Sequence, residues 1–78
     1  MNILPKSLAV IIIGVAFDDD MLAVFLSDGR EIRVPLEWFP MLRDASPEER
    51  LHWRLIGKGI GIHWPGLDED LSLEGLLT

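Results

Sequence analysis

The stretch with the most reactive side chains is Gly59–Asp70 (GIGIHWPGLDED), which contains His63, Asp68, Glu69 and Asp70. A histidine near carboxylates has the groups that proteins use for general acid–base catalysis, for metal binding and for contact with a charged partner. A zinc site needs three or four converging ligands, and a calcium loop needs alternating ligands over about twelve residues with a closing glutamate. The stretch matches neither pattern, so we predict no metal ion, no cofactor and no catalytic residue here.

We expect His63 to have a structural role. It alternates with the apolar Ile62 and Trp64, which places it on the less apolar face of a strand. There it is expected to hydrogen-bond a neighbouring carboxylate or a backbone carbonyl and so fix the following turn. The other histidine, His52, has no spacing that suggests a shared metal site.

The three carboxylates Asp68–Asp70 are expected to precede the last helix, where acidic side chains favour the positive end of the helix dipole. One of them is also expected to pair with Arg50, Arg54 or Lys58. The same side chains suit contact with a basic partner, so a structural role and a partner contact both stay open. The candidate partner-binding residues are Trp53, His63, Asp68, Glu69 and Asp70.

These residues need a scaffold, and the pattern predicts a single α+β domain over residues 1–78. Three apolar runs separated by polar turns predict a three-stranded antiparallel meander over Leu8–Phe17, Leu22–Ser27 and Glu31–Leu36. The pair Asp28-Gly29 supplies the positive φ of a tight hairpin. Pro35 is expected at the end or on the edge of the third strand, because proline cannot donate to the ladder.

A capped helix is predicted to follow the meander. Ser46-Pro47-Glu48-Glu49 has the residues of a capping box with proline at the first helical position, so the helix is expected to run to about Leu55. Leu51 and Leu55 would share its apolar face. Trp53 lies off that face, and we predict that it is the exposed aromatic at an interface.

The last third of the chain predicts a fourth strand and a short C-terminal helix packed on the sheet. The alternation over Ile60–Trp64 places Ile60, Ile62 and Trp64 in the core. Ser72 is expected to cap a helix over Leu73–Leu77. Because a helix precedes Gly57, Gly59 and Gly61 and a strand follows them, a dinucleotide-binding loop is excluded, and these glycines are expected to allow close backbone approach.

Composition narrows the class of function. The chain has no cysteine and a net charge of −6, which excludes disulfides and thiolate metal sites and disfavours direct binding to nucleic acid. An acidic chain attracts a basic protein instead. The apolar run Leu8–Phe17 is far shorter than the roughly 20 residues that span a bilayer, and it lacks a cleavage motif. We therefore expect a cytoplasmic protein with no membrane contact.

The order of four motifs resembles a widespread family of small bacterial proteins that is catalogued as a domain of unknown function. The motifs are Ser27-Asp28-Gly29, Pro35-Leu36, Ser46-Pro47-Glu48-Glu49-Arg50, and Gly59–Ser72 followed by Gly75-Leu76-Leu77. The resemblance implies a bacterial α+β domain that stands alone or is fused to a helix-turn-helix domain. It also implies, for stand-alone members, a neighbouring small protein in what look like toxin–antitoxin pairs. No helix-turn-helix pattern occurs before Thr78, so the DNA-binding role is not expected here.

Three hypotheses from different classes follow. The leading one is a non-enzymatic, antitoxin-like interaction module that binds a small basic bacterial protein. The second is a ligand-sensing regulatory domain that acts with a separate DNA-binding partner, which requires a cavity beside His63 and Trp64. The third, less favoured, is a small metal-dependent enzyme. A homodimer formed through the apolar first strand or through an open sheet edge is compatible with all three.

Overall fold

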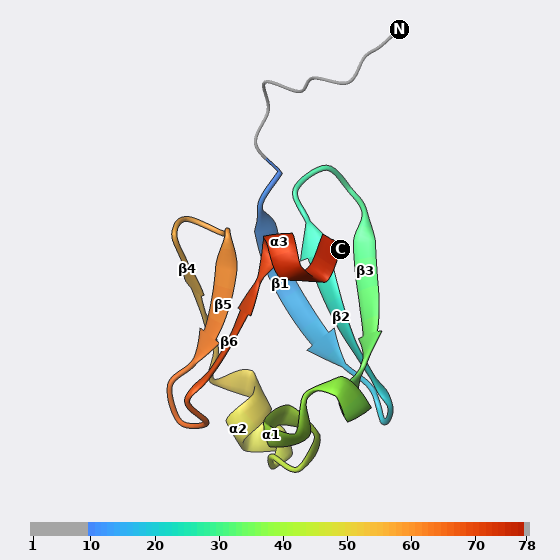
Figure 1. Cartoon of the computed structure of the whole chain (residues 1–78), viewed down its shortest axis with the longest axis vertical. Coiled ribbons are helices and arrows are strands. Elements are labelled where there is room, and N and C mark those ends of the chain that lie inside the picture. Colours follow the sequence, from blue (N-terminus) through green and yellow to red (C-terminus); the bar gives the residue numbers. More distant parts are fainter. Residues whose placement is uncertain (1–9, 78) are drawn as a thin grey trace, which may run out of the picture.

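The computed structural model describes residues 10–77, and it contains two three-stranded antiparallel sheets on either side of one core (Figure 1). One sheet has the order β1-β2-β3 and the other β4-β5-β6, where the six strands in the order β1 to β6 are Ile12–Phe17, Met21–Leu26, Glu31–Pro35, Arg54–Ile56, Gly61–Trp64 and Glu69–Ser72. The short helices η1, α1, α2 and α3 are Leu36–Trp38, Pro40–Arg43, Pro47–Leu51 and Leu73–Leu77. The predicted α+β class is confirmed, with two strands more than expected.

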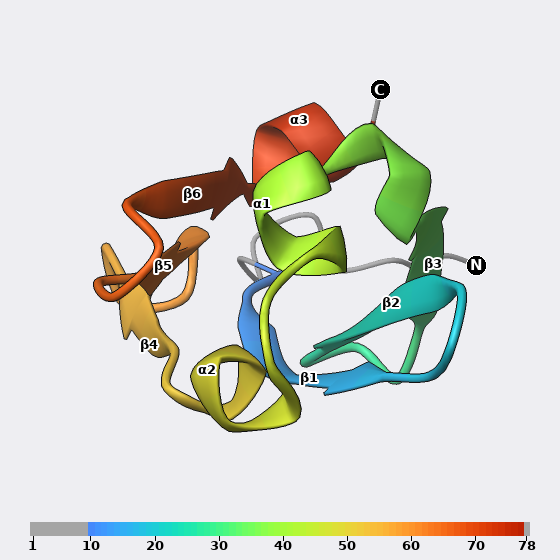
Figure 2. The same cartoon turned by 90° about the horizontal axis from the view of Figure 1, so that it is seen from below.

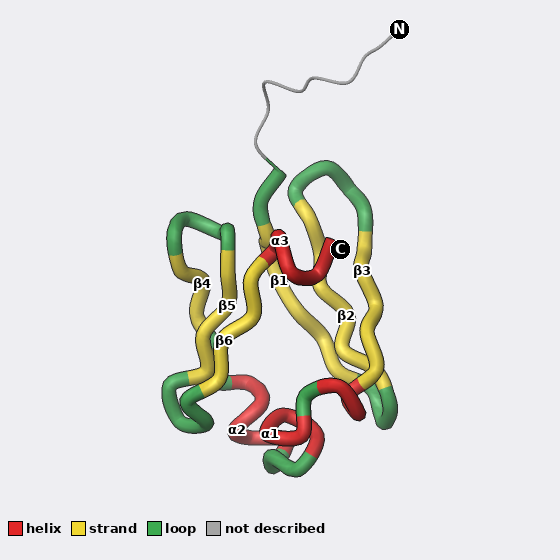
Figure 3. The backbone as a smooth tube through the Cα atoms, in the orientation of Figure 1, coloured by secondary structure: helices red, strands yellow, loops and turns green. Residues whose placement is uncertain are grey.

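The helices lie at the two ends of the core that the sheets enclose (Figure 1). Seen from below, α1 and α2 close one end (Figure 2). At the other end α3 lies between the two sheets, and the strands run between these helical ends (Figure 3). No helix within residues 10–77 has the length and apolar character needed to cross a bilayer.

The predicted hairpin between β2 and β3 is confirmed. The N–H of Leu26 donates to the carbonyl of Arg30 at 2.9 Å, and Gly29 takes a φ of +94° in the turn. Pro35 is the last residue of β3, which is an edge strand, so its missing N–H costs no ladder bond.

Strand β1 is shorter than the predicted strand Leu8–Phe17, whose first two residues lie outside the described part of the chain. A β-bulge interrupts its pairing with β2 between Ile12 and Gly14. The extra residue, Ile13, is 57% exposed, and the bulge turns Val15 and Phe17 to the side of the sheet that carries the buried Ile12. The bulge therefore aims these two side chains at the space beside α2.

The helix predicted to reach Leu55 ends at Leu51. Its capping box is present, because Ser46 Oγ accepts from the N–H of Glu49 at 3.0 Å and Glu49 Oε1 accepts from the N–H of Ser46 at 2.9 Å. The following residues Arg54–Ile56 form β4 and pair with β5, so tertiary pairing overrides helix propensity here. Leu51 and Leu55 do not share a helix face, and Leu51 is 71% exposed.

The acidic segment before α3 is strand β6, and the predicted role of Asp68–Asp70 at a helix N-terminus is wrong. Glu69–Ser72 pairs antiparallel with β5, with Leu71 buried on one face and Asp70 exposed on the other. The two strands are joined by a turn in which Asp68 takes a φ of +53°. The predicted C-terminal helix is confirmed, and Ser72 Oγ accepts from the N–H of Gly75 at 3.0 Å.

The core draws on both sheets. Leu22 and Val24 from β2, and Ile62 and Trp64 from β5, are fully buried in one cluster that also holds Leu42 of α1. The prediction that Trp64 is a core residue is confirmed. The same prediction for Ile60 is wrong, because this residue precedes β5 and is 61% exposed.

The alternate glycines allow the close approach that the sequence predicts. Gly59 has a φ of +102°, and a Cβ built on it would lie 2.7 Å from the Cβ of Ile11. Its carbonyl accepts from the N–H of Ile12 at 2.8 Å, which joins the two sheets. A Cβ on Gly61 would lie 3.0 Å from the carbonyl oxygen of Leu71. A larger residue at Gly59 would therefore push the sheets apart.

Candidate functional site

Two of the candidate residues, His63 and Asp70, form a pair on the outer face of the β4–β6 sheet. They are direct cross-strand partners on β5 and β6, and His63 Nδ1 hydrogen-bonds Asp70 Oδ1. The prediction that His63 bonds a neighbouring carboxylate is confirmed. The flanking Ile62 and Trp64 point into the core, so the pair lies on the opposite, wetter face.

The remaining candidate carboxylates do not converge on this pair. Asp68 is in the turn, and Glu69 lies opposite Trp64. Arg54 is the cross-strand partner of His63 on β4, yet none of the ion pairs among residues 10–77 joins Arg54, Arg50 or Lys58 to Asp68–Asp70. The predicted pairing with these bases is therefore wrong. Nor do three His, Asp or Glu side chains of the described residues gather as metal binding would require.

Several of the carboxylates before Gly59 are paired with arginines. Arg33 contacts Asp18 at 2.6 Å, and Arg43 contacts Asp44 at 2.9 Å. The pKa of Asp18 is held below its usual range first by the backbone N–H of Asp20 and further by Arg33. Hydrogen bonding to Arg43 lowers the pKa of Asp44 in the same way. These side chains contribute little net potential.

The C-terminal segment Gly59–Thr78 keeps its negative charge. Gly59–Thr78 contains the four carboxylates Asp68, Glu69, Asp70 and Glu74 and neither Lys nor Arg. Within residues 10–77 none of the four forms an ion pair with a Lys or Arg. Asp70 contacts His63, and the other three have no ion-pair partner among these residues. The β6–α3 side therefore carries an uncompensated negative field that attracts cations.

An apolar groove lies beside these carboxylates. Two adjoining hollows, of about 470 Å³ and 320 Å³, share Ile60 and Ser72. Ile60 is 61% exposed and Leu77 is 51% exposed, so two large apolar side chains that line one hollow face solvent together. Glu74 lines the larger hollow, and Asp70 lines the smaller one. We call the surface formed by Ile56, Ile60, Asp70, Glu74 and Leu77 the acidic groove.

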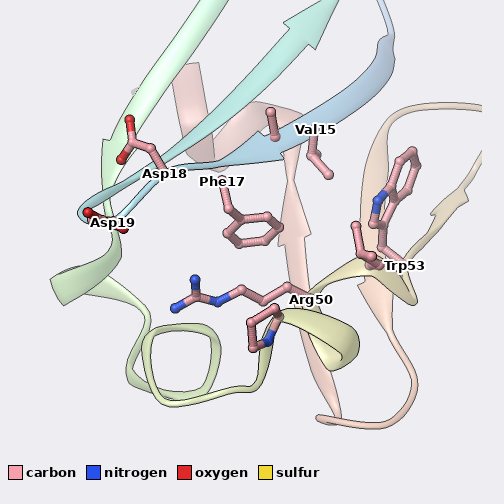
Figure 4. A pocket seen from close by; sticks show the side chains of 9 residues that line it. Val15, Phe17, Asp18, Asp19, Arg50 and Trp53 are labelled. Carbon is pink, nitrogen blue, oxygen red and sulfur yellow. The ribbon is translucent and has the colours of Figure 1, made fainter.

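A second concave site lies at the other end of the molecule, between β1 and α2 (Figure 4). Its volume is about 300 Å³, and its apolar walls are Val15, Phe17, Pro47, Leu51 and Trp53. We call this site the α2 pocket.

Arg50 of α2 also lines the α2 pocket, and its side chain hydrogen-bonds the backbone of α1. Its Nε donates to the carbonyl of Leu42 at 2.9 Å, and Nη2 donates to the carbonyl of Arg43 at 2.8 Å. The Arg50 carbonyl in turn accepts from Trp64 Nε1 at 3.1 Å. The guanidinium is therefore fixed between α1, α2 and the core.

The prediction of an exposed Trp53 is wrong. Trp53 follows α2 rather than lying within it, and it is half-buried against the core at the α2 pocket. The exposed tryptophan is Trp38, with 67% of its surface accessible. The candidate residues thus divide between two places, with Trp53 in the α2 pocket and His63 and the carboxylates on the β4–β6 sheet and its turn.

Three site residues, Phe17, Arg50 and Ile60, were not predicted from the sequence. Phe17 and Arg50 are 33 positions apart in the chain, and no local pattern indicates that β1 and α2 meet. A signal was available for Ile60, because it stands between Gly59 and Gly61, and clustered glycines are typical of a turn.

Comparison with known proteins places the chain among proteins of undetermined function. Residues 12–78 match the model of a family described as "Protein of unknown function (DUF2442)". A crystal structure of a protein of unknown function from Rhodospirillum rubrum ATCC 11170 is similar, with 30% sequence identity and a TM-score of 0.72. The match covers 88% of this chain and 86% of that one. Among curated proteins, none matches this chain.

Proposed function

We propose that this chain, which belongs to the DUF2442 family of proteins of unknown function, is a non-enzymatic interaction module that binds a small basic protein through its acidic groove. In this proposal it acts in the cytoplasm in an antitoxin-like manner, by occupying a basic partner. The antitoxin-like part rests on the gene neighbourhood that the resemblance of the sequence implies. The choice of surface rests on the charges and contacts of the chain itself.

One observation carries the proposal: exposed large apolar side chains lie next to carboxylates that have no Lys or Arg partner among residues 10–77. Ile60 and Leu77 are both more than half exposed, and Glu74 lines the same hollow. Interfaces combine an apolar centre with a polar rim, and charge of one sign increases the rate of association with the opposite sign. A partner segment with aliphatic residues flanked by Lys or Arg would match both features.

Neither His63 nor Trp64 lines the concave sites described above, so the cavity that the ligand-sensing hypothesis requires is not beside them. Trp64 is fully buried, and other residues line those sites. A sensing role would therefore use the α2 pocket.

The first test is capture of the partner from the native cytoplasm on the tagged full chain, at low and at high salt, with identification by mass spectrometry. We expect one small basic protein at low salt that is released at high salt, because exposed charge pairs are screened. Ile60→Ser should reduce the captured amount at least several-fold, since it removes the centre of the groove.

The matched control is Ile13→Ser, which removes a similarly exposed isoleucine from β1 instead. Both variants should keep wild-type thermal stability, because both side chains are mostly in water. Equal loss of the partner in both variants, or no stoichiometric partner at either salt, would refute the proposal.

A further inference from the structure

The α2 pocket has a different character from the acidic groove. It contains two aromatic rings, those of Phe17 and Trp53, and Leu51 at its edge is 71% exposed. Its volume of about 300 Å³ is at the lower limit of small-molecule sites, so it suits a ligand the size of a single amino acid. Figure 4 shows the Phe17 ring between Trp53 on one side and the acidic turn after β1 on the other.

A positive charge without a carboxylate partner lines this pocket. Arg50 makes two hydrogen bonds to backbone carbonyls, and its guanidinium carbon lies 5.2 Å from the centre of the Phe17 ring. Within residues 10–77 no Asp or Glu forms an ion pair with it. The carbonyls fix the guanidinium in one orientation, which prepares it to receive a carboxylate.

A negative charge without a cationic partner lines the same pocket. The turn after β1 contributes Asp18 and Asp19, and both lie toward the Arg50 guanidinium end in Figure 4. Asp18 is already used, because it accepts from the N–H of Met21 at 2.7 Å and from Arg33 at 2.6 Å. Asp19 makes no hydrogen bond or ion pair within the described residues, so its carboxylate is available to a ligand.

From these three features we infer that the α2 pocket binds a free apolar α-amino acid, such as phenylalanine or leucine. The ligand carboxylate meets Arg50, the ammonium group meets Asp19, and the side chain lies over Phe17 toward Trp53. Each ligand charge thereby gains a partner that forms no ion pair within residues 10–77, and the apolar side chain covers aromatic surface. A residue inside a polypeptide has neither charge, so this site is distinct from the groove for a protein partner.

The test uses nuclear magnetic resonance on the full chain with L-phenylalanine and L-leucine as probes. The Trp53 indole N–H should shift in a saturable manner, whereas that of Trp38, which lies outside the pocket, should stay unchanged. Phenylalaninamide lacks the carboxylate, N-acetylphenylalanine lacks the ammonium group, and glycine lacks the side chain. Each of the three should bind at least tenfold more weakly than phenylalanine.

A pair of neighbouring substitutions completes the test. Asp19→Asn should weaken phenylalanine binding at least tenfold while leaving N-acetylphenylalanine binding unchanged, because only the former has an ammonium group. Asp20→Asn is the control, since it removes the same charge one residue away, from a side chain that does not line the pocket. No saturable Trp53 shift with either amino acid, or equal effects of the two substitutions, would overturn the inference.

Discussion

The guanidinium of Arg50 lies over the ring of Phe17, with 5.2 Å between the guanidinium carbon and the ring centre. The same ring meets Trp64 edge to face, with 6.2 Å between ring centroids. One phenylalanine therefore connects the capped helix α2, the strand β1 and the buried tryptophan of β5. Because Arg50 also donates to two carbonyls near the end of α1, this contact holds together the end of the fold where the α2 pocket lies.

Replacing Arg50 should accordingly destabilise the protein. Arg50→Met keeps most of the aliphatic stem but loses two charge-assisted hydrogen bonds and the cation–π contact. We expect a loss of about 1–3 kcal/mol in the free energy of unfolding, measured by urea denaturation. Arg54→Met is the control, because Arg54 is exposed and has no ion pair in the described chain, and it should change stability by no more than about 0.5 kcal/mol. Equal effects of both substitutions would show that the Arg50 contacts are not stabilising.

The junction of the two sheets at Gly59 should tolerate no side chain. Gly59→Ala introduces a Cβ at a φ of +102°, 2.7 Å from the Cβ of Ile11. Strain and overpacking together should cost about 2–4 kcal/mol. Gly66→Ala is the matched control, since no heavy atom lies within 4 Å of its new Cβ and its φ is not positive. Thermal melts of both variants compare them directly, and a Gly59→Ala protein as stable as Gly66→Ala would contradict the described packing.

Stability should fall in acid partly because of Asp18. Hydrogen bonds from the backbone N–H groups of Asp20 and Met21, and from Arg33, lower the pKa of Asp18 in the folded state. A group with a lowered folded pKa stabilises the protein above its unfolded pKa, near 3.8, and this stabilisation is lost as the pH falls through the folded pKa. Asp18→Asn should therefore flatten the dependence of stability on pH in this acid range.

The pH experiment is read from urea midpoints between neutral pH and acid. Asp19→Asn is the control, because Asp19 is exposed and makes no hydrogen bond or ion pair within residues 10–77, and it should keep the wild-type slope. An unchanged slope in Asp18→Asn would mean that the hydrogen bonds to Asp18 do not persist in solution.

The sequence predicted those parts of the fold that depend on neighbouring residues. Asp28-Gly29 formed its hairpin and Ser46 with Glu49 formed the capping box, because turn and cap geometry is decided within a few residues. Strand β4 could not be predicted, because all three of its residues are exposed and show no apolar alternation. Strand β6 was missed because Glu69 and Asp70 are poor strand formers, and pairing with β5 outweighs that preference.

Only those features of the candidate site that depend on neighbouring residues were predicted from the sequence. The bond between His63 and a carboxylate follows from the wetter face of one strand, although its register with Asp70 depends on an unpredicted strand. The position of Trp53 was wrong because it depended on a helix that ends before it. The α2 pocket depends on the meeting of β1 with α2, which is a long-range contact, so no pattern in a single segment indicates it.

If the acidic groove binds a basic partner, the affinity of the two proteins must fall as the salt concentration rises. The dissociation constant of the captured partner should be measured over a range of ionic strength for wild type and for Asp70→Asn/Glu74→Gln. The control is Asp20→Asn/Glu48→Gln, which removes the same two charges from exposed positions outside the groove. We predict that the groove variant binds at least tenfold more weakly at low salt and with a shallower salt dependence, while the control stays within a few-fold of wild type. Equal affinities and equal salt slopes for the two variants would contradict the claim.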